Sequence, residues 1–270
     1  MNRLVIFVLS FGRKKVPTLA NIADKSSVYV LTSDDNPFKN EIELQGARLM
    51  VFDKEVFRGE GLEMMNEESV PNKRSATYGY NYAIRWGRSN GYKYVLVLDD
   101  DYVMTMAVNE RTGHHPKIDK WAKHACTFLD KHPEVAATAS INLGQLFSGS
   151  FNSYFLGLKK WQLMNTIVFN TDYKHEFRSL GNADYVTSLQ HNCASPNLVV
   201  RLQTILLQME TINQKKHATA DYSNIFYARW SVVMAQPAYA RVEILKIKGC
   251  MSTRFNTVIL SNSCPKIVSL

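Results

Sequence analysis

The sequence is poor in cysteine, and its cysteines are not spaced like a metal site or a disulfide framework. Structural zinc sites use closely spaced Cys and His ligands, and small disulfide-held domains are much richer in cysteine. The chain has no Cys-x-x-Cys pair and no matched histidine pair, and its four cysteines are Cys126, Cys193, Cys250 and Cys264. We therefore expect reduced thiols that pack in the core.

Long apolar runs are also missing. The run Leu4–Leu9 is much shorter than the hydrophobic region of a signal peptide, and no later run reaches the length of about 20 residues that spans a bilayer. We expect no membrane segment and a cytoplasmic location. Internal repeats and low-complexity segments are absent too, so the 270 residues, 46% of them hydrophobic, suggest one domain with a sizeable core.

Acidic residues are fewer than basic ones. The chain has 32 Lys and Arg against 24 Asp and Glu, which gives a formal net charge of +8. Such a balance suggests a polyanionic partner, nucleic acid first. The basic residues are dispersed along the chain, so the charge by itself does not locate a binding surface. The sequence does not indicate an oligomeric state.

The most informative stretch is Tyr94 to Asp101, an apolar run that ends in three carboxylates. The apolar run predicts a buried strand of a parallel or mixed sheet, and ligands bind at the carboxyl edge of such sheets. Three adjacent carboxylates raise one another's pKa unless a cation neutralises them, which favours a divalent metal with oxygen ligands. Alternate side chains of an extended chain point to the same face, so Asp99 and Asp101 should lie on one face and Asp100 on the other. The alternative is an acidic turn that caps the next element.

The first predicted strand, Leu4–Leu9, leads directly into Ser10, Gly12 and Arg13. Glycine allows close approach to the backbone, and arginine offers a fork of donors, so this turn could hold a phosphate or a nucleotide. A plain turn into a helix over Pro17–Lys25 explains the same residues equally well. The second strand, Val28–Leu31, ends in a loop that starts at Thr32 and could bind a base or ribose, or simply cap a helix.

A third strand is predicted at Leu49–Phe52, and a helix opens near Pro71 and closes at Asn90-Gly91. Arg74 lies in the first turn of that helix, where the helix dipole disfavours a cation unless an anion is held there. Because this helix leads into the acidic strand, it delivers Arg74 and the carboxylates towards one edge. The alternation of strands and helices predicts an α/β sheet of nucleotide-binding type.

The second half of the chain has a less regular pattern. We predict a helix at Ile118–His132, strands at Val135–Ile141 and Leu163–Asn170, a helix at Leu198–Ile212, and strands at Phe226–Met234 and Val242–Ile247. Lys54–Val70 and Asn142–Asn152 are expected to be mobile. Basic and aromatic residues interleave near the C-terminus, which suits a nucleic-acid groove or, equally, an amphipathic edge strand.

The order of these motifs resembles a GT-A glycosyltransferase, an α/β fold whose mixed sheet is flanked by helices. More narrowly, Asn72-Lys73-Arg74, with Tyr78 and Tyr80, followed by Tyr94 to Tyr102, resembles the TET-associated glycosyltransferases. Members of that family add sugars to hydroxymethylated pyrimidines in DNA. The resemblance covers most of the chain loosely and is specific around residues 71 to 102. It implies one GT-A domain over 1–270, with a nucleotide-sugar half at 1–102 and an acceptor half at 103–270.

The resemblance also implies a set of functional residues. Asp99 and Asp101 would bind Mn²⁺ or Mg²⁺, and Asp101 would serve catalysis. Asp184 would act as the general base, which an inverting mechanism needs and a retaining mechanism does not. The donor, expected to be UDP-glucose, would contact Ser10, Gly12, Arg13, Thr32, Arg74, Asp99 and Asp100. The family often brings a further His ligand from the C-terminal region, but residues 248 to 266 contain none, which leaves the coordination shell open.

Three alternatives remain from the sequence. A metal-dependent nuclease or nucleotidyltransferase also uses clustered aspartates, although few other carboxylates stand near strand ends. A DNA-binding accessory protein could use the same fold without catalysis, and an intact Asp triplet argues against it. Within the glycosyltransferase interpretation, the acceptor could be protein, lipid or polysaccharide instead of DNA.

Overall fold

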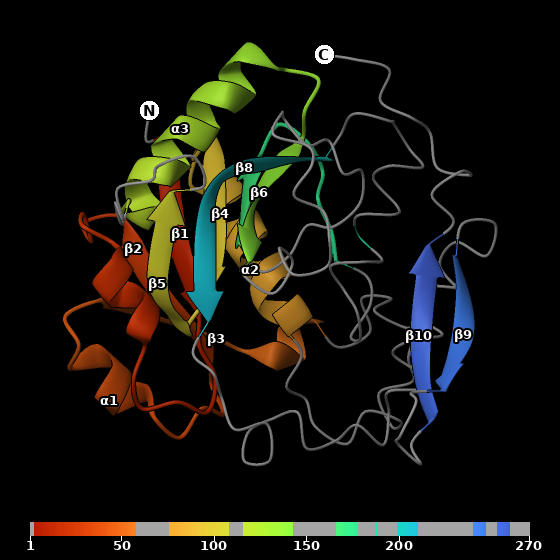
Figure 1. The fold of residues 1–270 in the computed structure, drawn as a ribbon. Coiled ribbons are helices and arrows are strands. Elements are labelled where there is room, and N and C mark those ends of the chain that lie inside the picture. Colours follow the sequence, from red (N-terminus) through yellow and green to blue (C-terminus); the bar gives the residue numbers. More distant parts are fainter. Residues whose placement is uncertain are drawn as a thin grey trace.

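The computed structural model describes residues 3–57, 76–107, 116–142, 166–177, 187, 199–209, 240–246 and 253–259. Its centre is an eight-stranded sheet with the order β3-β2-β1-β4-β7-β6-β8-β5 (Figure 1). Helices pack on the two faces of this sheet. This is the mixed α/β sheet flanked by helices that the sequence predicts.

The first four strands of this order are parallel. They are β3 (Arg48–Phe52), β2 (Val28–Ser33), β1 (Leu4–Leu9) and β4 (Tyr94–Asp99). Because β1 and β4 lie in the middle and are covered on both faces, their residues are apolar without alternation. All four predicted strands of the N-terminal half are therefore confirmed.

The other four strands make the sheet mixed. They are β7 (Thr166–Asn170), β6 (Ala137–Asn142), β8 (Val199–Met209) and β5 (Tyr102–Ala107). β7 is antiparallel to both β4 and β6, β8 is parallel to β6, and β5 is antiparallel to β8. The predicted strands that became β6 and β7 are confirmed, whereas the sequence did not indicate β5.

The predicted helix over Leu198–Ile212 is wrong, since Val199–Met209 forms β8. This strand lies between β6 and β5 inside the sheet. A strand in that position has neighbours on both edges, and its apolar residues need not alternate. The apolar residues of this segment are interrupted by Arg201, Gln203, Thr204 and Gln208, and their spacing does not separate a helix from a strand.

The helical segments are η1 (Pro17–Asn21), α1 (Lys39–Glu43), η2 (Lys54–Phe57), α2 (Ala76–Ser89) and α3 (Ile118–Lys131). α3 confirms its prediction, and α2 confirms the part of its predicted helix that the structure describes. The helix expected over Pro17–Lys25 is only the 3-10 helix η1, because the chain is already extended at Ile22. The Asn21 side chain there donates to the Tyr102 carbonyl at 2.8 Å, which ties this end to the start of β5.

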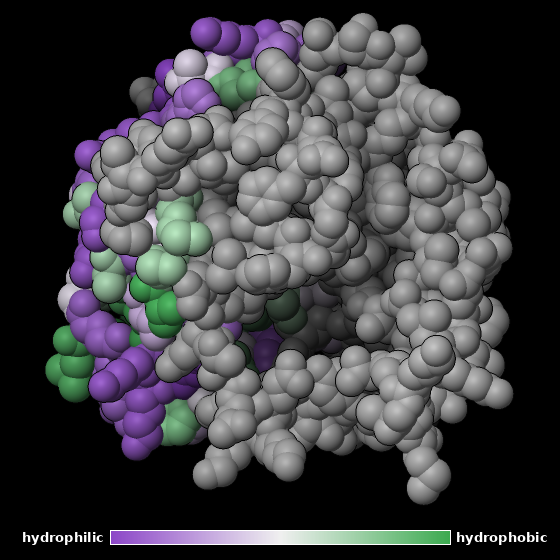
Figure 2. All heavy atoms as spheres, viewed as in Figure 1, coloured by the Kyte–Doolittle hydropathy of each residue, from purple (hydrophilic) through white to green (hydrophobic). Residues whose placement is uncertain are grey.

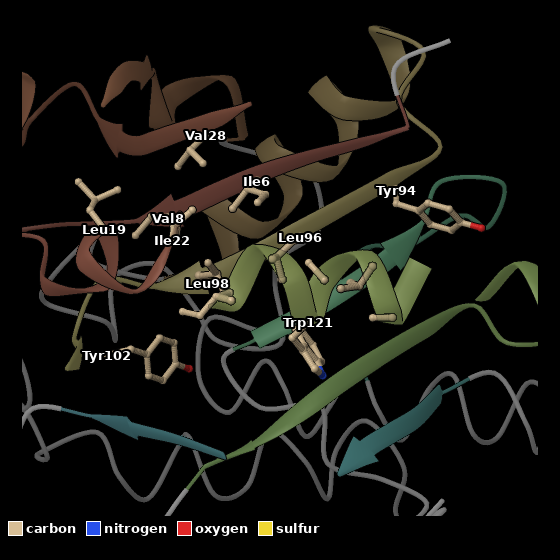
Figure 3. Close-up of a cluster of buried hydrophobic side chains, with 14 of the residues drawn as sticks. Ile6, Val8, Leu19, Ile22, Val28, Tyr94, Leu96, Leu98, Tyr102 and Trp121 are labelled. Atoms are coloured by element: carbon tan, nitrogen blue, oxygen red, sulfur yellow. The ribbon is translucent and has the colours of Figure 1, made fainter. Parts of the chain in front are cut away.

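Successive residues of β1 and β4 point to opposite faces of the sheet and build two cores. On one face, Leu96 and Leu98 pack in a cluster with Trp121 of α3 (Figure 3). On the other face, Val95 and Val97 share a cluster with residues of α2. β4, which leads into the acidic residues, is thus packed between α3 on one face and α2 on the other.

Within the described ranges, a second sheet is formed by β9 (Ala240–Lys246) and β10 (Thr253–Ile259), which pair antiparallel. β9 confirms the strand predicted at Val242–Ile247, and β10 was not predicted. The predicted strand Phe226–Met234 and the segment Asn142–Asn152, apart from its first residue, lie outside the described residues. Within the described part, no helix has the length and apolar character needed to cross a membrane. The described surface in Figure 2 is mainly hydrophilic, with separate hydrophobic patches.

Candidate active site

The carboxyl ends of β1 and β4 form the centre of the candidate site. The chain leaves β1 and next forms β2, which lies on one side of β1, whereas β4 lies on the other side. Such a reversal of strand order opens a crevice at the carboxyl ends of the two strands, where α/β proteins bind ligands. Leu9 is paired with Asp99 in register, so Ser10 and Asp100 follow at the same level.

Ser10 and Asp100 are joined directly. The Ser10 hydroxyl donates a hydrogen bond to Asp100 Oδ2 at 2.7 Å, and both residues are buried. The residues are 90 positions apart in sequence, and the parallel pairing of β1 with β4 brings them together. Two of the predicted donor-site residues therefore form one contact at the predicted edge.

Arg13 joins this pair to the next carboxylate. Its Nε lies 3.2 Å from Asp100 Oδ1 and its Nη2 lies 3.2 Å from Asp101 Oδ2. The exposed fractions of the three side chains are 20%, 10% and 7%. Gly12, just before it, has a φ of 72°, a conformation that glycine adopts without strain. The glycine thus lets the chain turn so that the arginine side chain reaches back over the end of β4.

Asp100 and Asp101 share Arg13 as a partner, whereas the prediction pairs Asp99 with Asp101. β4 ends at Asp99, so the alternation of an extended chain does not continue to Asp101. Thr18 fixes this bend, because its hydroxyl donates to the Asp99 carbonyl at 2.7 Å and accepts from the Tyr102 amide at 2.9 Å. The metal assignment to Asp99 and Asp101 stays a prediction.

Burial has the largest effect on the pKa of Asp100. It raises the pKa of that carboxyl from 3.8 to about 6, although the Ser10 hydrogen bond and the Arg13 charge act in the opposite direction. Asp101 adds to the rise because a second negative charge stands beside it. A buried carboxylate pair of this kind is stabilised by any cation placed between its oxygens.

Thr32, near the end of β2, and Asn36, in the loop that follows, lie beside the loop after β1. Asn36 Nδ2 donates to Thr32 Oγ1 at 2.6 Å and to the Ser10 carbonyl at 3.4 Å, and its Oδ1 accepts from the Gly12 amide at 3.4 Å. Asn36 is buried and links the loops after β1 and β2. It was not among the predicted site residues, since a lone Asn before a proline indicates only a turn.

Lys54 is a second residue that sequence reasoning missed. Its ammonium group forms an ion pair with Asp35 at 2.9 Å and lies 4.5 Å from the centre of the Phe11 ring. The same carboxyl group accepts from the Ser33 hydroxyl at 2.5 Å. These contacts tie the loop after β1 to the ends of β2 and β3. They place a cation, an aromatic ring and a carboxylate beside the predicted donor residues.

The side-chain oxygens at this end of the sheet suit a hard divalent cation. Asp100 and Asp101 offer carboxylate oxygens, and they already hold one positive group, the Arg13 guanidinium. Among the described residues, no group of three or more His, Cys, Asp and Glu side chains is arranged to hold a metal. Mg²⁺ is commonly bound by one or two carboxylates together with substrate phosphates, and two carboxylates fit that pattern.

Two predicted site residues cannot be placed beside this cluster. Arg74 and Asp184 lie outside the described residues. The nearest described residues in sequence are Ala76, two positions after Arg74, and Thr187, three positions after Asp184. Their roles in donor binding and proton transfer stay predictions.

Solved structures with a similar fold include glucosyl-3-phosphoglycerate synthase. Glucosyl-3-phosphoglycerate synthase from Mycobacterium tuberculosis, in complex with Mg²⁺ and UDP, is 10% identical with a TM-score of 0.53, over 96% of this chain and 88% of that chain. A structure of that synthase with Mn²⁺ and UDP-glucose is 11% identical with a TM-score of 0.53, over 96% and 87% of the two chains. At such identities the likeness establishes the fold, which is GT-A.

The family follows from the sequence itself. No curated protein sequence matches the chain. The sequence model of the TET-Associated Glycosyltransferase family matches residues 4–219, which is most of the chain and includes β1, the acidic end of β4 and Asp184. The chain therefore belongs to the TET-associated glycosyltransferase family and is a glycosyltransferase with a GT-A fold.

Proposed function

We propose that this enzyme transfers glucose from UDP-glucose to the hydroxymethyl group of a modified pyrimidine in DNA, with Mn²⁺ or Mg²⁺ as cofactor. The observation that carries the proposal is the contact of Ser10 and Arg13 with Asp100 and Asp101 at the β1/β4 edge. A carboxylate pair and an arginine at such an edge fit a metal-bound diphosphate.

The donor half of the proposal covers residues 1–102. Similar folds were solved with UDP, UDP-glucose, Mg²⁺ and Mn²⁺, which supports the donor class. Here Ser10, Gly12 and Thr32 would line the donor, and Arg13 and Arg74 would pair with its diphosphate. Asn36 would keep the loops around Gly12 and Thr32 in place through the hydrogen bonds already described.

Asp101 is the carboxylate common to both candidate metal pairs. The sequence pairs it with Asp99, and the contact with Arg13 pairs it with Asp100. When bound, the divalent ion would neutralise the charge that develops on the departing diphosphate. Ser10 and Thr18 would keep the end of β4 in the conformation that offers these oxygens.

The acceptor half covers residues 103–270. Asp184 would remove the proton of the acceptor hydroxyl while that oxygen bonds to the sugar carbon, and the bond from this carbon to the diphosphate oxygen would break. UDP and the glucosylated base are the products. The formal net charge of +8 and the family assignment support a DNA acceptor. We expect the enzyme to meet this acceptor in the cytoplasm.

A transfer assay tests the proposal. Duplex DNA that contains 5-hydroxymethylcytosine or 5-hydroxymethyluracil is incubated with the protein, Mn²⁺ and a panel of nucleotide sugars, and the nucleosides are analysed by mass spectrometry. A hexose mass on one base is expected, lost with chelator and with Asp101→Asn. The exposed carboxylate Asp172 offers a matched control, and Asp172→Asn should leave transfer unchanged.

Two other outcomes separate the parts of the proposal. Hydrolysis of the donor without transfer to either DNA would overturn the DNA acceptor and leave the donor site in place. Transfer that survives both the chelator and Asp101→Asn would overturn the metal role of the β4 carboxylates.

A further inference from the structure

We propose that the outer side of α3 binds the sugar-phosphate backbone of duplex DNA and brings this acceptor to the active-site edge. The inference rests on the proposed function, because it takes DNA as the acceptor. It adds a binding surface formed by Lys117, Lys120, Lys123 and Lys131, which is called the lysine row below.

The lysine row follows one side of α3, which covers one face of the large sheet (Figure 1). At 3.6 residues per turn its four members lie within about a third of the helix circumference, and at 1.5 Å per residue the row is about 21 Å long. Lys120, Lys123 and Lys131 are exposed, and Lys117, the residue just before the helix, is partly exposed. The ammonium groups therefore lie on the solvent side along the whole helix.

The two acidic residues of α3 do not neutralise this row. Asp119 is buried, and its Oδ1 accepts a hydrogen bond from the Ala23 amide at 2.9 Å. Asp130 Oδ1 accepts from the Tyr94 hydroxyl at 2.7 Å and lies 2.9 Å from the Lys93 ammonium. Both carboxylates are thus engaged by groups outside the row. Within the part of the chain that the structure describes, the row's lysines form no ion pair.

One exposed carboxylate lies close to the row. The pKa of Asp24 is lowered mainly by hydrogen bonds from Ser26, and the charge of Lys123 lowers it further. The Asp24 carboxylate already accepts from the Ser26 amide at 3.0 Å and from the Ser26 hydroxyl at 2.6 Å. Four ammonium groups near one such carboxylate leave a positive surface, which attracts a polyanion.

Duplex DNA fits this surface better than a membrane does. A helix that binds a membrane buries an apolar side among the lipids. The apolar side of α3, which includes Trp121 and Leu129, already packs in the core, and the exposed residues of the helix are all polar or charged. B-DNA carries one negative charge per about 1.7 Å of its axis, so a row of about 21 Å passes several phosphates.

The start of the row lies next to the active-site edge. Lys117 Nζ donates to the Ala20 carbonyl of η1 at 2.9 Å. Thr18, also on η1, donates to the Asp99 carbonyl at the end of β4. Because α3 begins beside the segment that holds the acidic turn, a duplex bound along the row reaches the edge where the donor is proposed to bind.

Binding of a fluorescently labelled, unmodified duplex, followed by anisotropy at several salt concentrations, tests this surface. An unmodified duplex suffices because phosphate contacts carry no base information. The double variant Lys120→Gln/Lys123→Gln should bind more weakly. Its slope of log affinity against log salt should be smaller by about 2, because each phosphate contact contributes about 0.9. Adding Lys131→Gln should lower the slope by about 1 more.

Lys39→Gln/Arg48→Gln is the matched control. It also removes two positive charges, but on α1 and on β3 at the other edge of the sheet, and it should keep the slope of the unmodified protein. Thermal unfolding checks that the Lys120→Gln/Lys123→Gln variant is folded, which is expected because glutamine has nearly the helix propensity of lysine.

The inference is overturned if Lys120→Gln/Lys123→Gln keeps the slope of the unmodified protein, or if the control variant lowers the slope as much. Loss of binding to phosphatidylserine vesicles with unchanged duplex binding would assign the row to a membrane and would also overturn it. Absence of duplex binding by the unmodified protein overturns it as well. Glucose transfer to hydroxymethylated duplex then shows whether the DNA acceptor of the proposed function stands without this surface or fails with it.

Discussion

The side chain of Asn81 on α2 holds the backbone of Phe177 through two hydrogen bonds, each 2.8 Å long. Its Nδ2 donates to the Phe177 carbonyl, and its Oδ1 accepts from the Phe177 amide. Both residues are buried, and the Phe177 ring stacks on Tyr80 at 4.6 Å between centroids. α2 is thereby joined to the segment that follows β7.

Asn81→Ala should lower the free energy of unfolding by on the order of 2 to 4 kcal/mol, because it leaves a buried amide and a buried carbonyl without partners. Asn90→Ala is the control: that side chain donates to the Trp86 carbonyl at 2.8 Å but is exposed, and its loss should cost less than about 1 kcal/mol. Chemical denaturation measures both. If both variants lose the same free energy of unfolding, the buried hydrogen bonds to Phe177 contribute no more than the exposed one.

Ser10→Ala should destabilise the protein by about 1 to 3 kcal/mol, because Asp100 loses a hydrogen bond inside a buried site. Ser26→Ala provides the comparison, since Ser26 donates to Asp24 at 2.6 Å in an exposed turn. The exposed pair should contribute much less, because water replaces the lost hydrogen bond there. A larger loss at Ser26 than at Ser10 would contradict the role of burial. Thermal unfolding of the metal-free protein is the measurement.

Asp100→Asn should stabilise the metal-free protein at pH 8 and leave its stability unchanged near pH 4. The pKa of Asp100 is raised from 3.8 to about 6 in the folded protein, so the folded state favours the protonated form. That contribution is present below the unfolded pKa and is lost as the pH rises through about 6. The gain at pH 8 should be on the order of 3 kcal/mol.

The measurement for Asp100 is the midpoint of thermal unfolding as a function of pH. Asp172→Asn, at an exposed position, should show no such pH-dependent gain. A stabilisation by Asp100→Asn that is the same at pH 4 and pH 8 would mean that ionisation is not its cause.

Gly87→Ala should be destabilising despite the better helix propensity of alanine. Gly87 lies on α2, and a Cβ at this position would be 2.3 Å from Val95 Cγ2 on β4. Val95 is buried and β-branched, so it cannot easily turn away. We expect a loss of about 1 to 3 kcal/mol.

The second mutation Val95→Ala makes the test specific. It removes the methyl group that the new Cβ would meet, so the two losses should not add in the double variant. Gly79→Ala is a milder comparison, because the nearest atom there is the end of the Leu9 side chain at 2.9 Å. Additive losses for Gly87→Ala and Val95→Ala would contradict close packing as the cause.

The sequence by itself determined much of the sheet and the place of the site. Continuous apolar runs predicted β1, β2, β3 and β4, and a 3.6-residue pattern predicted α2 and α3. Polar residues that directly follow buried strands predicted ligands at the carboxyl edge. These features depend on which residues are apolar and on how they are spaced along the chain, and both can be read from a sequence.

Tertiary structure decided the rest, because it depends on pairing between distant segments. The spacing of apolar residues in β8 fits a helix as well as a strand, and pairing with β6 and β5 favours the strand. Only the register of Leu9 with Asp99 brings Ser10 to Asp100. The end of β4 at Asp99 is what gives Asp100 and Asp101 a common partner in Arg13. Spacing along the chain cannot reveal such contacts, since strand register is set by packing of the whole sheet.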